Sequence, residues 1–375
     1  MAGIYIHIPF CKRACHYCNF HFSTSLKQKD DMVAAILQEI TMRSDYLETK
    51  ELTSIYFGGG TPSLLDRQDL EKIFSRLSSY FSWKTSTEIT LEANPDDLSP
   101  KKLKELKDSA INRLSIGIQS FNQKDLTFMN RAHDALEAEK CIHDAHKAGF
   151  YNISADLIYG SPTTTDSIWE SNIEKMIELD IPHISAYCLT VEEGTALHHF
   201  VKTGKTAGTD DEKSSRQFDM LMTRMEEAGF DHYEISNFAK PGSYAVHNTN
   251  YWKGIPYLGI GPSAHSYDGH SLRSWNVAHN PKYIKSIQTG TLPIEHEHLG
   301  IKERYNEKIL ISLRTKWGLS EKEIQTDFPE LYPSFSEKIQ GFITKGHLMK
   351  LEGAYVLTKQ GKHIADRISM ELFAD

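Results

Sequence analysis

Short apolar runs alternate with amphipathic stretches over roughly the first half of the chain. The first run, Gly3–Ile8, is followed by a stretch in which Val33, Ile36, Leu37 and Ile40 recur at helical spacing. The predicted strands are Gly3–Ile8, Ser54–Phe57, Thr87–Glu92, Arg113–Gln119, Ile153–Tyr159 and His183–Thr190, and the predicted helices between them are Asp30–Leu47, Asp66–Phe81, Ser99–Ser109, Asp134–Ala148 and Thr165–Leu179. Strands that alternate with helices of this length predict a parallel α/β sheet.

The number of predicted units narrows the architecture. Six strand–helix units, rather than eight, favour an incomplete (β/α)6 TIM-like barrel, although spacing alone does not separate this from a doubly wound sheet. The pattern changes after about residue 200: Asp211–Ala228 is predicted to be a helix, and residues 231–275 are rich in His, Tyr, Asn and Gly and show little periodicity. Residues 301–375 fit three helices and two short strands, which is typical of a small winged-helix-like α+β module. We therefore expect three regions, 1–230, 231–300 and 301–375.

Charge and hydropathy exclude some classes of partner. The 375 residues carry a net charge of −8, and residues 319–375 are also more acidic than basic, so neither has the basic surface that nucleic-acid binding requires. The opening MAGIYIHIPFC has no basic segment of a signal peptide, and no stretch approaches the ~18 apolar residues of a membrane span. We expect a cytoplasmic protein.

Three of the five cysteines lie within one eight-residue segment. Cys11, Cys15 and Cys18 follow the first predicted strand, whereas Cys141 and Cys188 are isolated. An odd, clustered count indicates metal binding rather than disulfides. One alternative is a [4Fe–4S] cluster with one open iron. Another is zinc, with His16 or His21 as the fourth ligand.

Further polar residues follow the ends of the other predicted strands. Gly58–Thr61 follows the second strand, Glu92 ends the third and Gln119 ends the fourth, while Asp156 lies in the fifth. Because ligands of parallel α/β folds bind beyond the carboxyl ends of the strands, we expect these residues to line one open face.

The flanking residues resemble a known superfamily. The segment Tyr5-Ile-His-Ile-Pro-Phe-Cys11, the spacing of Cys15 and Cys18, and Gly58-Gly-Gly-Thr61-Pro62 are similar to the radical S-adenosylmethionine (SAM) superfamily, and within it to the oxygen-independent coproporphyrinogen III oxidase group. The resemblance implies the radical SAM type of partial barrel. It also implies a [4Fe–4S] cluster completed by SAM.

The resemblance implies a role for each matching residue. Cys11, Cys15 and Cys18 would ligate the cluster; Tyr5, Tyr17, Gly60 and Thr61 would contact SAM; Glu92 would hold its methionyl or ribose part; and Gln119, Arg131 and Asp156 would complete the pocket. Taken singly, Glu92 and Asp156 are equally well explained as capping or salt-bridge carboxylates, and Arg131 as a surface cation.

Two features argue against oxidase activity. The oxidase group has a further cysteine two positions after the third, where this chain has Phe20, and a long extension before its first cysteine, which here is residue 11. Coproporphyrinogen III oxidase, a radical SAM enzyme, therefore remains the alternative function rather than the leading one.

A third feature favours another family. His247-Asn248-Thr-Asn-Tyr251-Trp252 is similar to the His-Asn-x-x-Tyr-Trp motif of the heme chaperone HemW family. In that family His247 would ligate heme iron, and Tyr251 and Trp252 would contact the porphyrin. The alternative is a structural histidine beside two core aromatic rings.

The resemblance therefore implies a heme-binding protein. Such a protein would pass heme to acceptor proteins, among them membrane-associated respiratory proteins. The resemblance does not determine whether the protein forms a homodimer.

Overall fold

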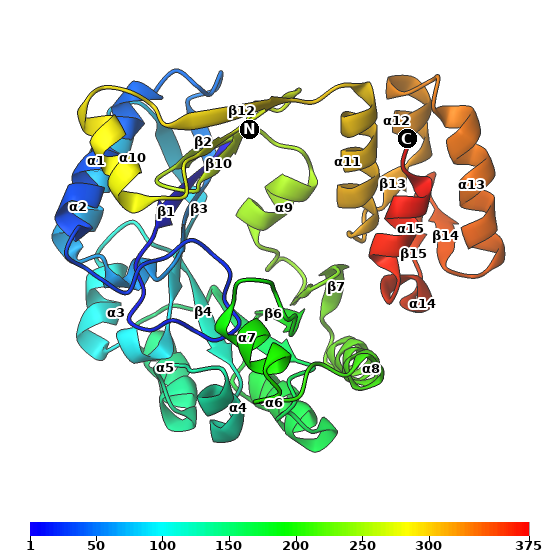
Figure 1. The fold of residues 1–375 in the computed structure, drawn as a ribbon, viewed down its shortest axis with the longest axis horizontal. Helices are drawn as coiled ribbons and strands as arrows, with labels where there is room; N and C mark the ends of the chain where they lie inside the picture. Colours follow the sequence, from blue (N-terminus) through cyan, green and yellow to red (C-terminus); the bar gives the residue numbers. More distant parts are fainter. Residues whose placement is uncertain (375) are drawn as a thin grey trace.

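A single 12-stranded sheet curves around a concave inner face at the centre of the computed structural model, which describes residues 1–374 (Figure 1). Its strand order is β12-β11-β10-β9-β1-β2-β3-β4-β5-β6-β8-β7. Strands β9 and β1 to β6 run parallel, and the outer strands pair antiparallel at both edges. The bounds are β1 (Gly3–Ile8), β2 (Glu51–Gly59), β3 (Ser82–Ala93), β4 (Arg113–Gln119), β5 (Ile153–Tyr159), β6 (His183–Cys188), β7 (Asp231–Glu234), β8 (Asn237–Ala239), β9 (Tyr257–Ile260), β10 (His265–Tyr267), β11 (Leu272–Asn276) and β12 (Ile294–His298).

Helices follow the parallel strands, and several of them begin at residues suited to cap them. Asp66 and Asp134 form capping boxes, and the Ser99 hydroxyl accepts a hydrogen bond from the Lys102 amide at 3.2 Å. The bounds are α1 (Lys29–Met42), α2 (Arg67–Ser78), α3 (Pro100–Lys107), α4 (Gln123–Phe128), α5 (Ala135–Lys147), α6 (Asp166–Glu178), α7 (Ala196–Lys202), α8 (Asp211–Glu227), α9 (Val246–Trp252) and α10 (Asn280–Gln288), with 3₁₀ turns at Pro62–Leu64 and Pro95–Asp97.

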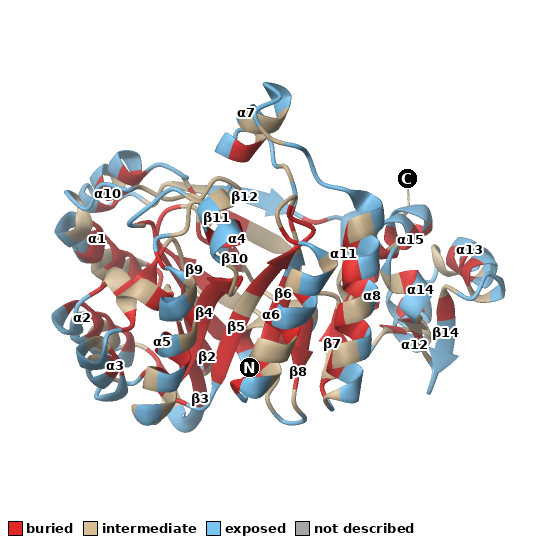
Figure 2. Ribbon diagram, turned by 90° about the horizontal axis from the view of Figure 1, so that it is seen from below, coloured by how far each residue is buried: buried red, intermediate tan, exposed pale blue. Residues whose placement is uncertain are grey.

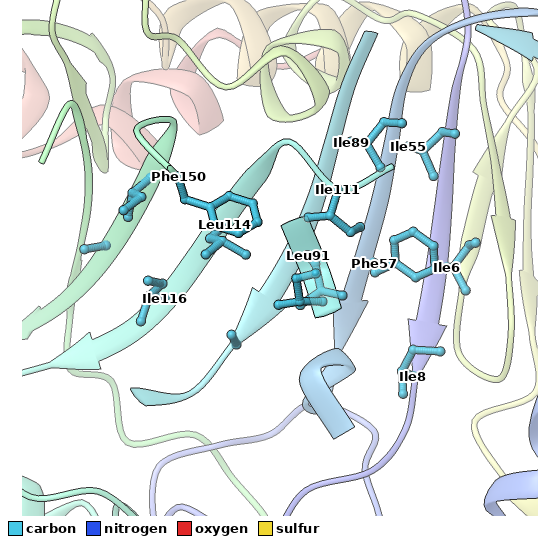
Figure 3. Packing of buried hydrophobic residues seen from close by; sticks show 14 of the residues in the cluster. Ile6, Ile8, Ile55, Phe57, Ile89, Leu91, Ile111, Leu114, Ile116 and Phe150 are labelled. Carbon is cyan, nitrogen blue, oxygen red and sulfur yellow. The ribbon is translucent and has the colours of Figure 1, made fainter. Parts of the chain in front are cut away.

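Alternation along each strand separates an apolar core from a polar inner face. Ile4, Ile6 and Ile8 of β1 are buried with the core, together with residues such as Phe57 and Leu91 of the neighbouring strands (Figure 3). The residues between them, including Tyr5 of β1, point to the inner face, where they meet other polar side chains. The expected incomplete α/β barrel is confirmed.

Residues 231–300 do not form a separate unit. They supply β7 and β8 at one edge of the sheet, β9 to β12 at the other, and α9, which packs against β2 on the inner side (Figure 1). The β9 edge is tied to α1, because Arg43 donates to the Gly259 carbonyl at 2.8 Å and Glu39 accepts from the Gly261 amide at 2.8 Å. This connection spans more than 200 residues of sequence.

The C-terminal module has its own hydrophobic core and a three-stranded antiparallel sheet, β13-β15-β14. It lies beside the β7 edge (Figure 1), where the Ile235 amide donates to the Arg314 carbonyl at 2.9 Å and the Lys316 amide to the Tyr233 carbonyl at 3.0 Å. Helices packed on a small sheet agree with the expected winged-helix-like module. The bounds are α11 (Ile301–Leu313), β13 (Leu319–Ser320), α12 (Glu321–Asp327), α13 (Tyr332–Thr344), β14 (Leu348–Leu351), β15 (Ala354–Leu357), α14 (Lys359–Lys362) and α15 (Ala365–Leu372).

Candidate functional site

The three clustered cysteines lie in the long loop between β1 and α1. The loop is anchored at its base by the Cys11 amide, which donates to the Ser23 carbonyl at 3.0 Å, and it is narrowed by the Cys18 amide, which donates to the Cys15 carbonyl at 3.3 Å. All three thiols are half-buried. One loop therefore presents three sulfur ligands at the carboxyl end of the central strand.

Two side chains from other parts of the chain contact these thiols: Thr61 follows β2, and Arg131 lies in the loop between α4 and α5. The Thr61 hydroxyl donates to Cys11 Sγ at 3.6 Å, and the Arg131 guanidinium donates to Cys15 Sγ at 3.3 Å. Burial raises the pKa of Cys11 to about 11, so the free thiol is protonated and would release its proton on binding metal.

The zinc alternative adds His16 or His21 to the three cysteines. Within residues 1–374, no three His, Cys, Asp or Glu side chains, the three cysteines included, converge closely enough to hold a single ion, so this arrangement does not distinguish zinc from a cluster. His21 Nε2 is paired with Asn280 Oδ1 at 2.7 Å, and His16 Nδ1 with the Phe128 carbonyl at 2.8 Å. Each histidine keeps its other ring nitrogen without a hydrogen bond in the described part of the chain, so these contacts do not exclude either as a zinc ligand.

The glycine run at the end of β2 allows the backbones of β1 and β2 to approach each other closely. A Cβ atom at Gly60 would lie 2.6 Å from the Phe10 carbonyl oxygen and 2.9 Å from that of Ile8, so the two strand ends approach too closely for any side chain. This contact holds Thr61 beside the cysteine loop.

Glu92 is the central carboxylate of the inner face. It accepts hydrogen bonds from the Tyr56 hydroxyl at 2.8 Å and the Gly59 amide at 3.1 Å. Burial raises its pKa to about 7, and the nearby charge of Asp156 adds to the effect. Glu92 can therefore bind a cationic or hydroxyl group of a ligand placed over the strand ends.

Arg131 connects three strand ends. Besides Cys15, its guanidinium donates to Asn94 Oδ1 at 2.6 Å and to the Gly117 carbonyl at 2.7 Å. Asn94 in turn donates to the Thr61 hydroxyl at 3.1 Å. Arg131 is thus part of the site and not a surface cation.

The remaining expected SAM residues lie on the same side of the sheet. Tyr5 is 6.1 Å from Tyr56, ring centre to ring centre, and burial raises the pKa of Asp156 to about 6. Gln119 ends β4 with a φ of 67°, a left-handed conformation that is uncommon for a residue other than glycine. Tyr17 packs against a small apolar cluster that contains Met129.

In the expected heme motif, His247 lies inside the barrel, whereas Asn248 and Trp252 lie at its margin. His247 is 2% exposed; its Nδ1 is 2.8 Å from Ser54 Oγ and its Nε2 is 2.8 Å from the Tyr251 hydroxyl. Burial lowers its pKa to about 3. Asn248 and Trp252 are half-buried. Both ring nitrogens of His247 are hydrogen-bonded to hydroxyl groups inside the barrel, and its role as a heme ligand stays a prediction.

Comparison with known proteins settles the family. Residues 5–176 match the Radical SAM superfamily. The heme chaperone HemW of Bacillus subtilis (strain 168) is 34% identical to this chain over 98% of each protein. The heme chaperone HemW of Lactococcus lactis subsp. lactis (strain IL1403) is 32% identical over 99% of this chain and 97% of its own length. This chain belongs to the HemW family.

A solved structure shows that the HemW-family chain shares its fold with an enzyme. The Escherichia coli coproporphyrinogen III oxidase HemN, described as a radical SAM enzyme, superposes with a TM-score of 0.85 at 21% identity, covering 100% of this chain and 90% of its own. At this identity the likeness establishes the fold alone.

Across residues 1–374, no helix combines the length and the apolar character that a membrane crossing requires.

Two residues of this site were not anticipated from the sequence of this HemW-family member. Tyr56 and Asn94 hold Glu92 and Arg131, respectively. Asn94 stands two positions after Glu92, and alternation along a strand places such residues on one side. That spacing was the available signal.

Proposed function

We propose that this protein holds a [4Fe–4S] cluster on Cys11, Cys15 and Cys18, binds SAM over the neighbouring strand ends, and binds heme for delivery to acceptor proteins. The observation that carries the cluster and SAM sites is the pair of contacts from Thr61 and Arg131 to the cysteine thiols. Residues far apart in sequence, each expected in the same site, meet at one loop.

The residues around this loop suit a chelating, charged ligand. Glu92 offers a carboxylate to the methionyl or ribose part of SAM, with Tyr5, Tyr17, Gly60, Thr61, Gln119, Arg131 and Asp156 around it. When bound, the cluster would supply a one-electron reductant to the SAM sulfonium. The protein's own contribution is to orient SAM through Glu92 and to hold the loop through Arg131.

The heme function is supported by family membership. Relatives that match this chain over nearly their whole length are heme chaperones. We propose the same cargo here, with acceptors that include membrane-associated respiratory proteins and with the cytoplasm as the place of action.

Coproporphyrinogen III oxidase is retained as the second candidate because the HemN fold matches this chain throughout. Against it, Phe20 occupies the position of the oxidase group's further cysteine, and 70% of its surface is exposed. A phenylalanine side chain has no atom that can ligate iron.

One sample can test both candidates. The protein is reconstituted with iron and sulfide without oxygen, and is then assayed for heme binding, for heme transfer to an apo-acceptor, and for conversion of coproporphyrinogen III with SAM and a reductant. We expect stoichiometric heme binding with transfer and no protoporphyrinogen. Protoporphyrinogen formed over several turnovers would favour the oxidase instead.

A further inference from the structure

Three rings inside the barrel form a stack that ends at the histidine of the heme motif. Tyr5 of β1 and Tyr56 of β2 stack with centroids 6.1 Å apart, and Tyr56 stacks on His247 of α9 with centroids 5.0 Å apart and 25° between the planes. Tyr56 is 8% exposed. Strands β2, β4 and β5 around these rings are buried over most of their length (Figure 2). Tyr56 therefore connects β2 to α9 by a contact that is shielded from water.

Tyr56 is also the hydrogen-bond partner of the carboxylate that is proposed to hold SAM. Its hydroxyl donates to Glu92 Oε1 at 2.8 Å, while the Gly59 amide donates to Glu92 Oε2 at 3.1 Å. No other side chain of residues 1–374 makes a hydrogen bond or a ring contact with both Glu92 and His247. A single side chain thus joins the expected SAM carboxylate to the expected heme ligand.

The packing around Tyr56 leaves little room for its ring to move independently. A Cβ atom at Gly58 would lie 2.9 Å from the Tyr56 ring, 2.8 Å from the Tyr5 ring and 3.1 Å from Glu92 Oε1. The lack of a side chain at Gly58 is what lets both rings and the carboxylate lie against one strand. Because closely packed interiors transmit strain, a change at Glu92 reaches the ring that covers His247.

Ligation of iron requires His247 to exchange one of its present partners. Its Nδ1 is 2.8 Å from Ser54 Oγ and its Nε2 is 2.8 Å from the Tyr251 hydroxyl, so one nitrogen has to leave a hydroxyl before it binds a metal. The Tyr56 ring lies against the face of the imidazole and opposes the turn or shift that frees this nitrogen. The freedom of Tyr56 therefore determines how readily His247 becomes available.

SAM brings hydrogen-bond donors to the carboxylate that holds Tyr56. The ammonium group and the ribose hydroxyls of SAM are donors, and both oxygens of Glu92 already accept hydrogen bonds. A donor of SAM at Oε1 shares or replaces the bond from the Tyr56 hydroxyl. Either change weakens that bond and loosens the ring.

We propose that Tyr56 is a positioning residue that couples the SAM site to the heme site. Without SAM, its bond to Glu92 holds its ring against His247; SAM bound at Glu92 releases the ring and favours ligation of heme iron by His247. This inference rests on the proposed function and adds its regulation. By thermodynamic linkage, SAM raises the affinity for heme by the same factor by which heme raises the affinity for SAM.

The first test measures hemin affinity with and without SAM in the full-length protein. The cluster is reconstituted without oxygen and no reductant is added, so that SAM stays intact. We expect saturating SAM to tighten hemin binding to the wild type roughly fivefold. Tyr56→Phe keeps the ring and loses the hydroxyl, so without SAM it should bind hemin about as tightly as the wild type does with SAM. Added SAM should then have no further effect.

Tyr283→Phe provides the matched control. Tyr283 of α10 is also buried and donates to a buried carboxylate, that of Glu39, at 2.6 Å, but it contacts neither Glu92 nor His247. We expect this variant to lose some thermal stability and to keep the wild-type response of hemin affinity to SAM. A residue with a merely structural role would not raise hemin affinity when its hydroxyl is removed.

The reverse titration measures the same coupling independently. SAM should bind roughly fivefold more tightly to hemin-loaded wild-type protein than to hemin-free protein, and equally tightly to both forms of Tyr56→Phe. A wild-type response to SAM in Tyr56→Phe, or no effect of SAM on hemin affinity in the wild type, would overturn the coupling while leaving both binding functions intact. Failure of the wild-type protein to bind hemin would overturn the proposed heme function as well.

Discussion

At the scale of single residues, Glu92 determines how SAM binding should depend on pH. Burial raises the pKa of Glu92 to about 7, and the hydrogen bonds from Tyr56 and the Gly59 amide limit the rise. The carboxylate is ionised above this pKa and protonated below it. We therefore expect SAM affinity to fall as the pH drops from about 8 to 6, because the neutral acid loses its charge and accepts hydrogen bonds less well.

Calorimetric titration of SAM into the reconstituted protein measures this dependence. Glu92→Gln should bind SAM weakly at every pH and with no slope in this range. A wild-type slope that persists in Glu92→Gln would assign the titration to another group, such as Asp156.

The cysteines allow a matched comparison. Cys11 contacts Thr61 in the loop, whereas Cys141 is buried in α5 and donates to the Ala138 carbonyl. Anaerobically reconstituted Cys11→Ser should lose the brown absorbance and most of the iron, while Cys141→Ala should retain about four iron and four sulfide. Iron and acid-labile sulfide analysis decides between these outcomes, and a full cluster in Cys11→Ser would count against the assigned ligands.

Much of the site could be predicted from the sequence because its residues follow strand ends in order. Cys11, Thr61 and Glu92 lie on one face because parallel strands present their carboxyl ends there, whereas Arg131 reaches Cys15 from the loop between α4 and α5. The position of His247 could not be predicted. The motif gives residue types and spacing, and only the packing of α9 against Ser54 decides that its ring points inward.

At the scale of elements, the contact between α1 and the β9 edge depends on one buried carboxylate. Glu39 is fully buried, accepts from the Tyr283 hydroxyl at 2.6 Å and from the Asn276 amide group at 2.7 Å, and lies 3.4 Å from Arg43. Its removal leaves a buried cation without its partner. We expect Glu39→Ala to lower the free energy of unfolding by about 3–5 kcal/mol.

Denaturant titration provides the measurement, with Glu71→Ala as the control. Glu71 pairs with Arg67 on α2, and both side chains are more than half exposed, so its loss should cost at most about 1 kcal/mol. Equal losses in the two variants would show that Glu39 does not hold the β9 edge against α1.

The contact between α1 and the β9 edge also explains which strands the sequence pattern did not predict. Strands β1, β4 and β5 have the predicted bounds because large apolar residues recur along them at strand spacing. Strand β12 reads Ile-Glu-His-Glu-His and has no apolar alternation, and β10 has three residues. Such strands are stabilised by distant partners such as Arg43, and a local pattern does not contain that information.

At the scale of the whole molecule, Ile235 joins the two hydrophobic cores. Its half-buried side chain packs against both the barrel core and that of the C-terminal module. We expect the wild-type protein to unfold in one cooperative thermal transition and Ile235→Asp to unfold in two, because a charge at this contact uncouples the cores. Leu136→Asp, at a position that is 79% exposed, should keep the single transition. A single transition in Ile235→Asp would place the coupling elsewhere.

The open barrel leaves two outer strands, and each is protected from pairing with another molecule in a different way. Residues 314–316 cover β7, through the bridge between Glu234 and Thr315 and the hydrogen bonds on either side of it. Four exposed acidic and histidine side chains line β12. Unpaired backbone groups at a sheet edge are templates for strand addition. The C-terminal module and the Glu-His-Glu-His segment therefore both protect against edge-to-edge polymerisation, and changes there can cause fibrous aggregation while the cluster site stays intact.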